Sequence, residues 1–167
     1  FGGESVLPLL DKYDNLLVVQ TFSKSRSLAG MRIGYAFGSR ELIGYLNDVK
    51  YSFNSYTMSH LALALGTAAV EDETYFQETL HKITATRERV KKALGFRFGD
   101  SQANFLFVTH PNWRAKELFE ALKEEHIYVR YFRKPRIDNY LRITIGTDDE
   151  MDVLLDFLRD YGKQEKN

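Results

Sequence analysis

The chain has 167 residues, and its 23 Lys and Arg residues balance 23 Asp and Glu residues, so the formal net charge at pH 7 is zero. Binding to a nucleic-acid backbone needs a basic excess, so no nucleic-acid partner is expected. Cysteine is absent, and the four histidines are scattered without metal-ligand spacing, so neither a disulfide framework nor a metal site is expected. The longest apolar stretches fall far short of the roughly 20 residues that span a bilayer, so no membrane partner is expected and the cytoplasm is the expected compartment.

The first 70 residues are expected to contain two strands and two helices. Residues 15–22 predict a strand buried on both faces in a parallel sheet, because the apolar residues Leu16 to Val19 run continuously and include β-branched valines. A second strand is expected over 31–37, between two glycines. An amphipathic helix over 40–50 and a buried helix over 55–70, rich in Ala and Leu, are expected to follow.

The remaining residues are expected to form a small sheet with helices on one face. The capping box at 74–77 predicts the start of a long helix that ends near residue 94 and has a charged outer face, which includes Arg87. Strands are then expected over 104–109, 127–132 and 140–145, with a helix over 112–125 between the first two. A second capping box, at 147–150, predicts a last helix that ends at Tyr161. We therefore expect an α/β fold with two parts, residues 1–72 and 73–167.

The segment that follows the first strand contains the most reactive group. Lys24 stands where open α/β folds place their ligands, at the carboxyl end of a strand. Hydroxyl groups, two glycines and Arg32 surround it in the sequence, and together they suit a phosphate dianion. A lysine amine can also form an imine with an aldehyde. Arg26, two residues after the lysine, is expected to be a solvent-facing charge.

The run Thr-Phe-Ser-Lys-x-x-x-Leu-Ala-Gly-x-Arg-x-Gly-Tyr, from residue 21 to 35, resembles the lysine motif of fold type I pyridoxal-phosphate aminotransferases. The resemblance implies that Lys24 binds the cofactor aldehyde as an imine. It also implies that Thr21, Ser23 and Arg32 hold the cofactor phosphate. In that family, residues 1–72 correspond to the end of the large domain, with a mostly parallel sheet, and residues 73–167 to the small C-terminal α/β domain.

Two later segments, 101–105 and 140–147, resemble small-domain motifs of the histidinol-phosphate aminotransferase branch. The second motif implies that Arg142 binds the substrate carboxylate, and Arg130 resembles a second substrate arginine. Asn104 matches a residue that contacts substrate in that branch. Alternation along 141–146 independently places Arg142 on the strand face opposite the apolar residues. An arginine fork suits a carboxylate or a phosphate.

The resemblance implies that the protein transfers an amino group from glutamate to a phosphorylated keto substrate, as a homodimer. An aromatic-amino-acid aminotransferase and a threonine-phosphate decarboxylase are alternatives within the cofactor class. An alternative from a different class is that the chain is a folded, non-catalytic fragment that does not bind cofactor. The resemblance covers only about the C-terminal half of the family's enzymes, and the chain begins with Phe1, so we expect it to be part of a longer one. The family's ring-stacking aromatic residue and ring-nitrogen aspartate lie in the other half.

Overall fold

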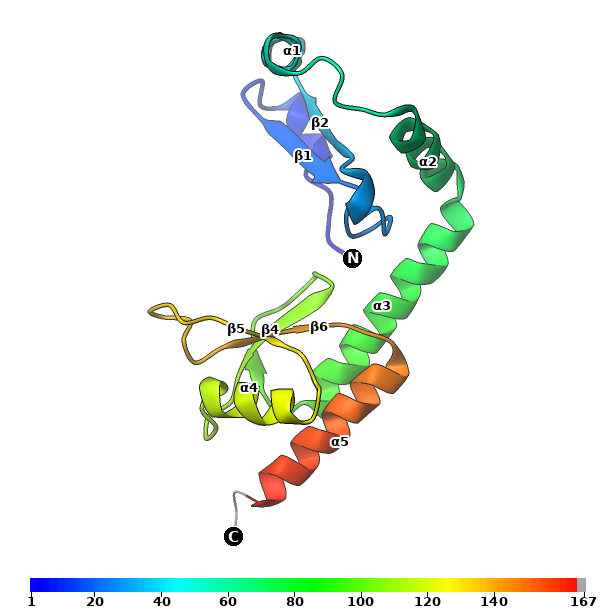
Figure 1. The fold of residues 1–167 in the computed structure, drawn as a ribbon. Helices are drawn as coiled ribbons and strands as arrows, with labels where there is room; N and C mark the ends of the chain where they lie inside the picture. The colour runs from blue at the N-terminus through cyan, green and yellow to red at the C-terminus, as the bar shows by residue number, and fades with distance from the viewer. Residues whose placement is uncertain (165–167) are drawn as a thin grey trace. The chain divides into compact units, whose positions relative to one another are not determined.

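The computed structural model describes residues 1–164, and these divide into two compact units (Figure 1). The N-terminal unit consists of residues 3–79. The C-terminal unit consists of residues 1–2 and, within the described part of the chain, residues 80–164. The boundary at residues 79 and 80 falls inside the long helix α3 (Glu73–Ala93), a little beyond the expected division at residue 72. Each unit is described by itself.

The N-terminal unit contains one small sheet and two helices of its own. Its elements are η1 (Leu7–Asp11), β1 (Leu17–Thr21), η2 (Ala29–Met31), β2 (Gly34–Gly38), α1 (Arg40–Phe53) and α2 (His60–Glu71), followed by the first residues of α3. Both helices begin at a serine cap, because the Ser39 and Ser59 hydroxyls accept bonds from backbone N–H groups in the first turn. The predicted helix over 40–50 is thus confirmed.

The expected parallel sheet is wrong for the part of the chain that the structure describes. Strands β1 and β2 pair antiparallel, with Leu17 opposite Gly38 and Thr21 opposite Gly34. A parallel pair would need a crossover connection, usually a helix, whereas the loop between these strands contains only the short η2 turn. The strand is also not buried on both faces, since Val18 is buried while Val19 is 65% exposed.

The expected burial of the second helix is also wrong. Helix α2 forms over His60–Glu71, but its buried residues are Ala62 and Gly66, and Leu61 remains 61% exposed. The helix's own apolar residues are spread around its whole circumference, so the sequence indicates no single face for burial. Only the side that meets Phe22 and Ile33 is covered.

The C-terminal unit is built on a four-stranded antiparallel sheet in the order β3-β4-β6-β5. The strands are β3 (Arg97–Phe98), β4 (Phe105–Thr109), β5 (Arg130–Tyr131) and β6 (Leu141–Thr144). Sequence periodicity predicted the last three strands. It missed β3, which is too short to show a period, and it made β5 too long.

Helices cover one face of this sheet, as predicted (Figure 1). They are the later part of α3, α4 (Ala115–Glu124) and α5 (Asp148–Gln164). Alternate sheet residues meet apolar helix residues in one core, whose most deeply buried members are Val90, Leu106, Val108, Leu118, Leu122, Leu141 and Leu154. Fully burying one such side chain contributes about 1.5–3 kcal/mol, so this core holds the unit together.

Of the two predicted capping boxes, one forms. At α5, the Thr147 backbone N–H donates to Glu150 at 2.8 Å and the Glu150 N–H donates to the Thr147 hydroxyl at 3.3 Å. At α3, the cap is instead Asp72, whose carboxylate accepts from the N–H of Tyr75. The helix therefore starts at Glu73, one residue before the predicted Thr74.

Candidate functional site

The loop after β1 presents the Lys24 side chain to solvent. Two backbone bonds close this loop, one from the N–H of Ser27 to the Lys24 carbonyl at 3.2 Å and one from Leu28 to Phe22 at 3.1 Å. Ser27 has φ of 56°, in the left-handed region that lets the chain turn sharply. The lysine is thus fixed at its backbone and exposed at its amine.

The three residues expected to hold a phosphate lie in the same unit as Lys24. Thr21 ends β1 and its hydroxyl accepts a bond from the Ser23 N–H at 3.3 Å. Arg32 follows η2 with φ of 56°, and its guanidinium donates to the Ala29 carbonyl at 2.9 Å. Thr21 and Arg32 are exposed and Ser23 is half-buried, so this donor set is open to a ligand.

Arg142 lies in the middle of β6, on the face opposite the core. Its neighbours Leu141 and Ile143 are 1% and 2% exposed and point into the core, so the alternation predicted from sequence is confirmed. Its guanidinium lies 5.2 Å from the ring centroid of Phe105. The Nε atom is buried and has no hydrogen-bond partner within residues 1–164. A buried donor without a partner is costly, and an incoming anion would satisfy it.

Arg130 stands directly opposite Arg142. The two residues are cross-strand partners in the β5·β6 ladder and therefore project from the same face. Together with Thr144 and aromatic residues they line an open hollow of about 470 Å³. Like charges placed opposite each other on a sheet repel, so this face favours an anion that bridges the pair.

Asn104 immediately precedes β4, and its backbone is held from two sides. Its carbonyl accepts from the N–H of Ile145 at 2.9 Å, and the preceding carbonyl, that of Ala103, accepts from Arg87 at 3.1 Å. The Ser101 hydroxyl donates to the Phe105 carbonyl at 2.7 Å. These bonds fix Asn104 beside the ring on which Arg142 packs.

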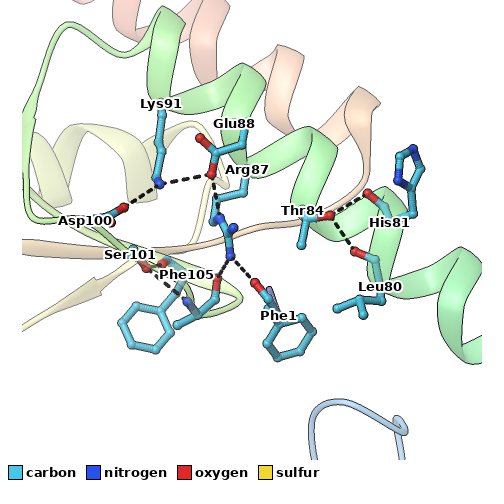
Figure 2. Close-up of polar contacts among 11 residues, drawn as sticks. Phe1, Leu80, His81, Thr84, Arg87, Glu88, Lys91, Asp100, Ser101 and Phe105 are labelled. Atoms are coloured by element: carbon cyan, nitrogen blue, oxygen red, sulfur yellow. Dashed lines mark hydrogen bonds and ion pairs between the residues drawn. The ribbon is translucent and has the colours of Figure 1, made fainter. Parts of the chain in front are cut away.

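Arg87 is a residue that the sequence analysis misplaced on the charged face of α3. It is 6% exposed, and the Phe1 and Ala103 carbonyls accept from it while Glu88 pairs with it at 3.0 Å (Figure 2). Lys91 and then Arg87 donate hydrogen bonds to the Glu88 carboxylate and hold its pKa below the usual range. No helical period could have revealed this position, because residues distant in sequence bury it.

The candidate residues thus lie in both units. Those expected to bind the cofactor belong to the N-terminal unit, namely Thr21, Ser23, Lys24 and Arg32, and those expected to bind substrate belong to the C-terminal unit, namely Asn104, Arg130 and Arg142. Over residues 1–164, no cluster of three potential metal ligands and no helix fit to cross a membrane is found.

Comparison with known proteins identifies the family. The sequence pattern of the family described as Aminotransferase class I and II matches residues 1–158. The chain is 58% identical over 167 residues to the histidinol-phosphate aminotransferase of Lactococcus lactis subsp. lactis, covering 98% of this chain and 46% of that protein. It therefore spans about half the length of the curated relatives that it matches.

Solved structures share the fold. A structure described as a putative histidinol-phosphate aminotransferase from Erwinia carotovora atroseptica is 24% identical and superposes with a TM-score of 0.84, over 98% of this chain and 47% of that one. The histidinol-phosphate aminotransferase of Sinorhizobium meliloti, solved in complex with pyridoxal-5'-phosphate, is 27% identical with a TM-score of 0.76, over 89% of this chain and 42% of that one. The sequence match over residues 1–158 and the shared fold together show that the chain belongs to the aminotransferase class I and II family.

Proposed function

We propose that the protein containing this chain is a pyridoxal-phosphate-dependent histidinol-phosphate aminotransferase. The observation that carries the proposal is the pair Arg130 and Arg142, which face the same hollow with a buried Nε unsatisfied. Glutamate and histidinol phosphate share one feature, an anionic end, and an arginine pair can bind either a carboxylate or a phosphate. The 58% identity to a histidinol-phosphate aminotransferase supports the same choice.

The residues around Lys24 fit pyridoxal phosphate by their chemistry. The cofactor has an aldehyde, which requires an exposed primary amine, and a phosphate, which requires hydroxyl and guanidinium donors. Lys24 would bind the aldehyde, while Thr21, Ser23 and Arg32 would hold the phosphate. When bound, the cofactor supplies a ring that withdraws the electron pair left on the substrate Cα.

The chain's own groups would then do the remaining work. Once the substrate amine has replaced Lys24 at the cofactor aldehyde carbon, the free Lys24 Nζ would remove the proton from the substrate Cα and deliver it to the cofactor carbon C4′. Arg142, with Arg130, orients the substrate by its anionic end, and Asn104 contacts it beside Phe105. We also propose that residues 1–72 belong to the large domain of this enzyme and residues 73–167 to its small domain. We propose that the enzyme is a homodimer and lies in the cytoplasm.

Borohydride reduction of the full-length enzyme with bound cofactor tests the lysine. Peptide mapping should find the label on Lys24, and a label on another residue refutes the assignment. Substrate choice is tested by comparing amino transfer from glutamate to the imidazole keto phosphate with transfer to aromatic keto acids. Release of carbon dioxide from threonine phosphate would instead indicate the decarboxylase. If the full-length protein binds no cofactor, the non-catalytic alternative stands.

A further inference from the structure

Arg26 belongs to the lysine loop, and its side chain contacts residues 43 and 47 positions further along the chain. The sequence suggested a solvent-facing charge, but only 18% of the side chain is exposed. Its guanidinium donates to the Ala69 carbonyl at 2.8 Å and to the Glu73 carboxylate at 3.2 Å. It also lies 3.7 Å from the ring centroid of Phe76. All of these residues belong to the N-terminal unit.

The three contacts meet at the junction of two helices. Ala69 is in the last turn of α2, where backbone carbonyls have no helical partner and attract a cation. Glu73 and Phe76 are in the first turn of α3. Arg26 therefore ties the lysine loop to the end of one helix and the start of the next. A lysine could not donate to two acceptors in a planar fork and stack on a ring at once.

The contacts of Arg26 act close to Lys24 along the chain. Arg26 lies inside the turn that the Ser27 N–H closes by donating to the Lys24 carbonyl, and the bond from the Leu28 N–H to the Phe22 carbonyl closes the whole loop. The Lys24 side chain itself is exposed. Fixing the residue between the two ends of the turn thus fixes the direction of the lysine.

We propose that Arg26 is a positioning residue that holds Lys24 in the orientation needed to bind cofactor and to transfer the proton. Arg26 acts through the loop backbone and through the α2 and α3 junction, not by touching substrate. The proposal rests on the proposed function for its catalytic consequence. Misplacing a reacting group by about 1 Å can cost on the order of 100-fold in rate.

The test compares Arg26→Met and Arg26→Lys with a matched control, Arg89→Met, in the full-length enzyme. Arg89 also binds two acidic partners, Asp148 and Asp152, but these contacts lie in the C-terminal unit. Amide hydrogen exchange of the cofactor-free protein is the first readout. For Arg26→Met, exchange across residues 22–31 should be about tenfold faster. Arg26→Lys should lie between it and the parent, and Arg89→Met should leave this segment unchanged.

Kinetics of the loaded enzyme are the second readout. Arg26→Met should lower kcat by about 10- to 100-fold with little change in the KM for glutamate, because the anion-binding arginines are intact. Arg89→Met should leave kcat unchanged, although both variants lower the melting temperature. If Arg26→Met does not fold, the smaller change in Arg26→Lys decides the question.

Three outcomes would overturn the inference. Parental exchange in residues 22–31 of both Arg26 variants would show that Arg26 does not fix the loop. An equal loss of kcat in Arg26→Met and Arg89→Met would show a general effect of stability. Faster exchange without a change in kcat would show an anchor with no catalytic role. If borohydride fails to label Lys24 in the parent, the proposed function itself fails, and the exchange data still report on the anchor.

Discussion

Replacing Arg142 by methionine should make the C-terminal unit more stable and less able to bind anions. Arg142→Met removes the buried Nε that has no partner within the described chain, and an unsatisfied buried donor costs about 1–3 kcal/mol. It also removes the repulsion with Arg130 across the ladder, about 0.2–1 kcal/mol for a cross-strand pair. Against this stands the loss of the contact with the Phe105 ring, about 0.5–1 kcal/mol.

The gains exceed the loss, and we expect a net stabilisation of about 1 kcal/mol, since methionine fills much of the same volume. For a unit of this size that corresponds to a rise in melting temperature of about 4–8 °C. Trp113 is the chain's one tryptophan and stacks on His110 at 3.8 Å in the C-terminal unit. Its fluorescence therefore follows the unfolding of this unit in the 167-residue chain.

Inorganic phosphate supplies the second measurement. At a concentration tenfold above its dissociation constant, bound phosphate should stabilise the parent by about 1.4 kcal/mol and the variant much less. Potassium chloride at equal ionic strength separates binding from screening. Arg97→Met, at an exposed position on β3, is the matched control and should keep the full response to phosphate. A lower melting temperature for Arg142→Met would refute the cost assigned to the unpaired Nε. An equal response to phosphate in parent and variant would refute the assignment of this face as an anion site.

Four further predictions concern Lys24, cofactor binding, the hydrophobic core and the dependence of stability on pH. Lys24→Ala in the full-length enzyme should abolish amino transfer without changing the melting temperature, and substantial remaining turnover would mean that another residue forms the imine. The 167-residue chain alone should bind pyridoxal phosphate weakly, because tight binding needs walls on most sides of a ligand, and micromolar binding by a monomer in an absorbance titration would contradict this. Leu122→Ala should lower the free energy of unfolding by about 2–5 kcal/mol in urea, whereas Leu46→Ala, at a 42% exposed position, should cost far less. The Thr86 hydroxyl and then Arg89 lower the pKa of Asp148, so this carboxylate stabilises the fold at neutral pH and loses that effect as the pH falls through its folded-state pKa. Asp148→Asn should therefore have a lower melting temperature than the parent at pH 7, and this difference should disappear as the pH falls through the folded-state pKa of Asp148; a constant difference would argue against the linkage.

The local sequence was sufficient to predict features whose geometry depends on a single helix or strand. The alternation around Arg142 placed the arginine opposite the core, and the structure confirms it, because successive side chains on a strand point to opposite faces whatever the strand pairs with. The capping box at Thr147 formed for the same reason, since its two bonds lie within one helical turn. The motif around Lys24 indicated the family that the whole-chain comparison then showed.

Tertiary structure decided which surfaces are covered and which chain segments meet. The apolar run of β1 could have entered a parallel sheet, but its only neighbour among the described residues is the antiparallel β2. Arg26 and Arg87 both read as surface charges along the sequence, yet each is held by acceptors far away in the chain, Ala69 in one case and Phe1 and Ala103 in the other. The hydrophobic pattern of a sequence depends only on the residues that are neighbours along the chain. It does not show which distant backbone carbonyl will lie beside a given arginine. For a charged side chain, such an acceptor determines whether burial is possible at all.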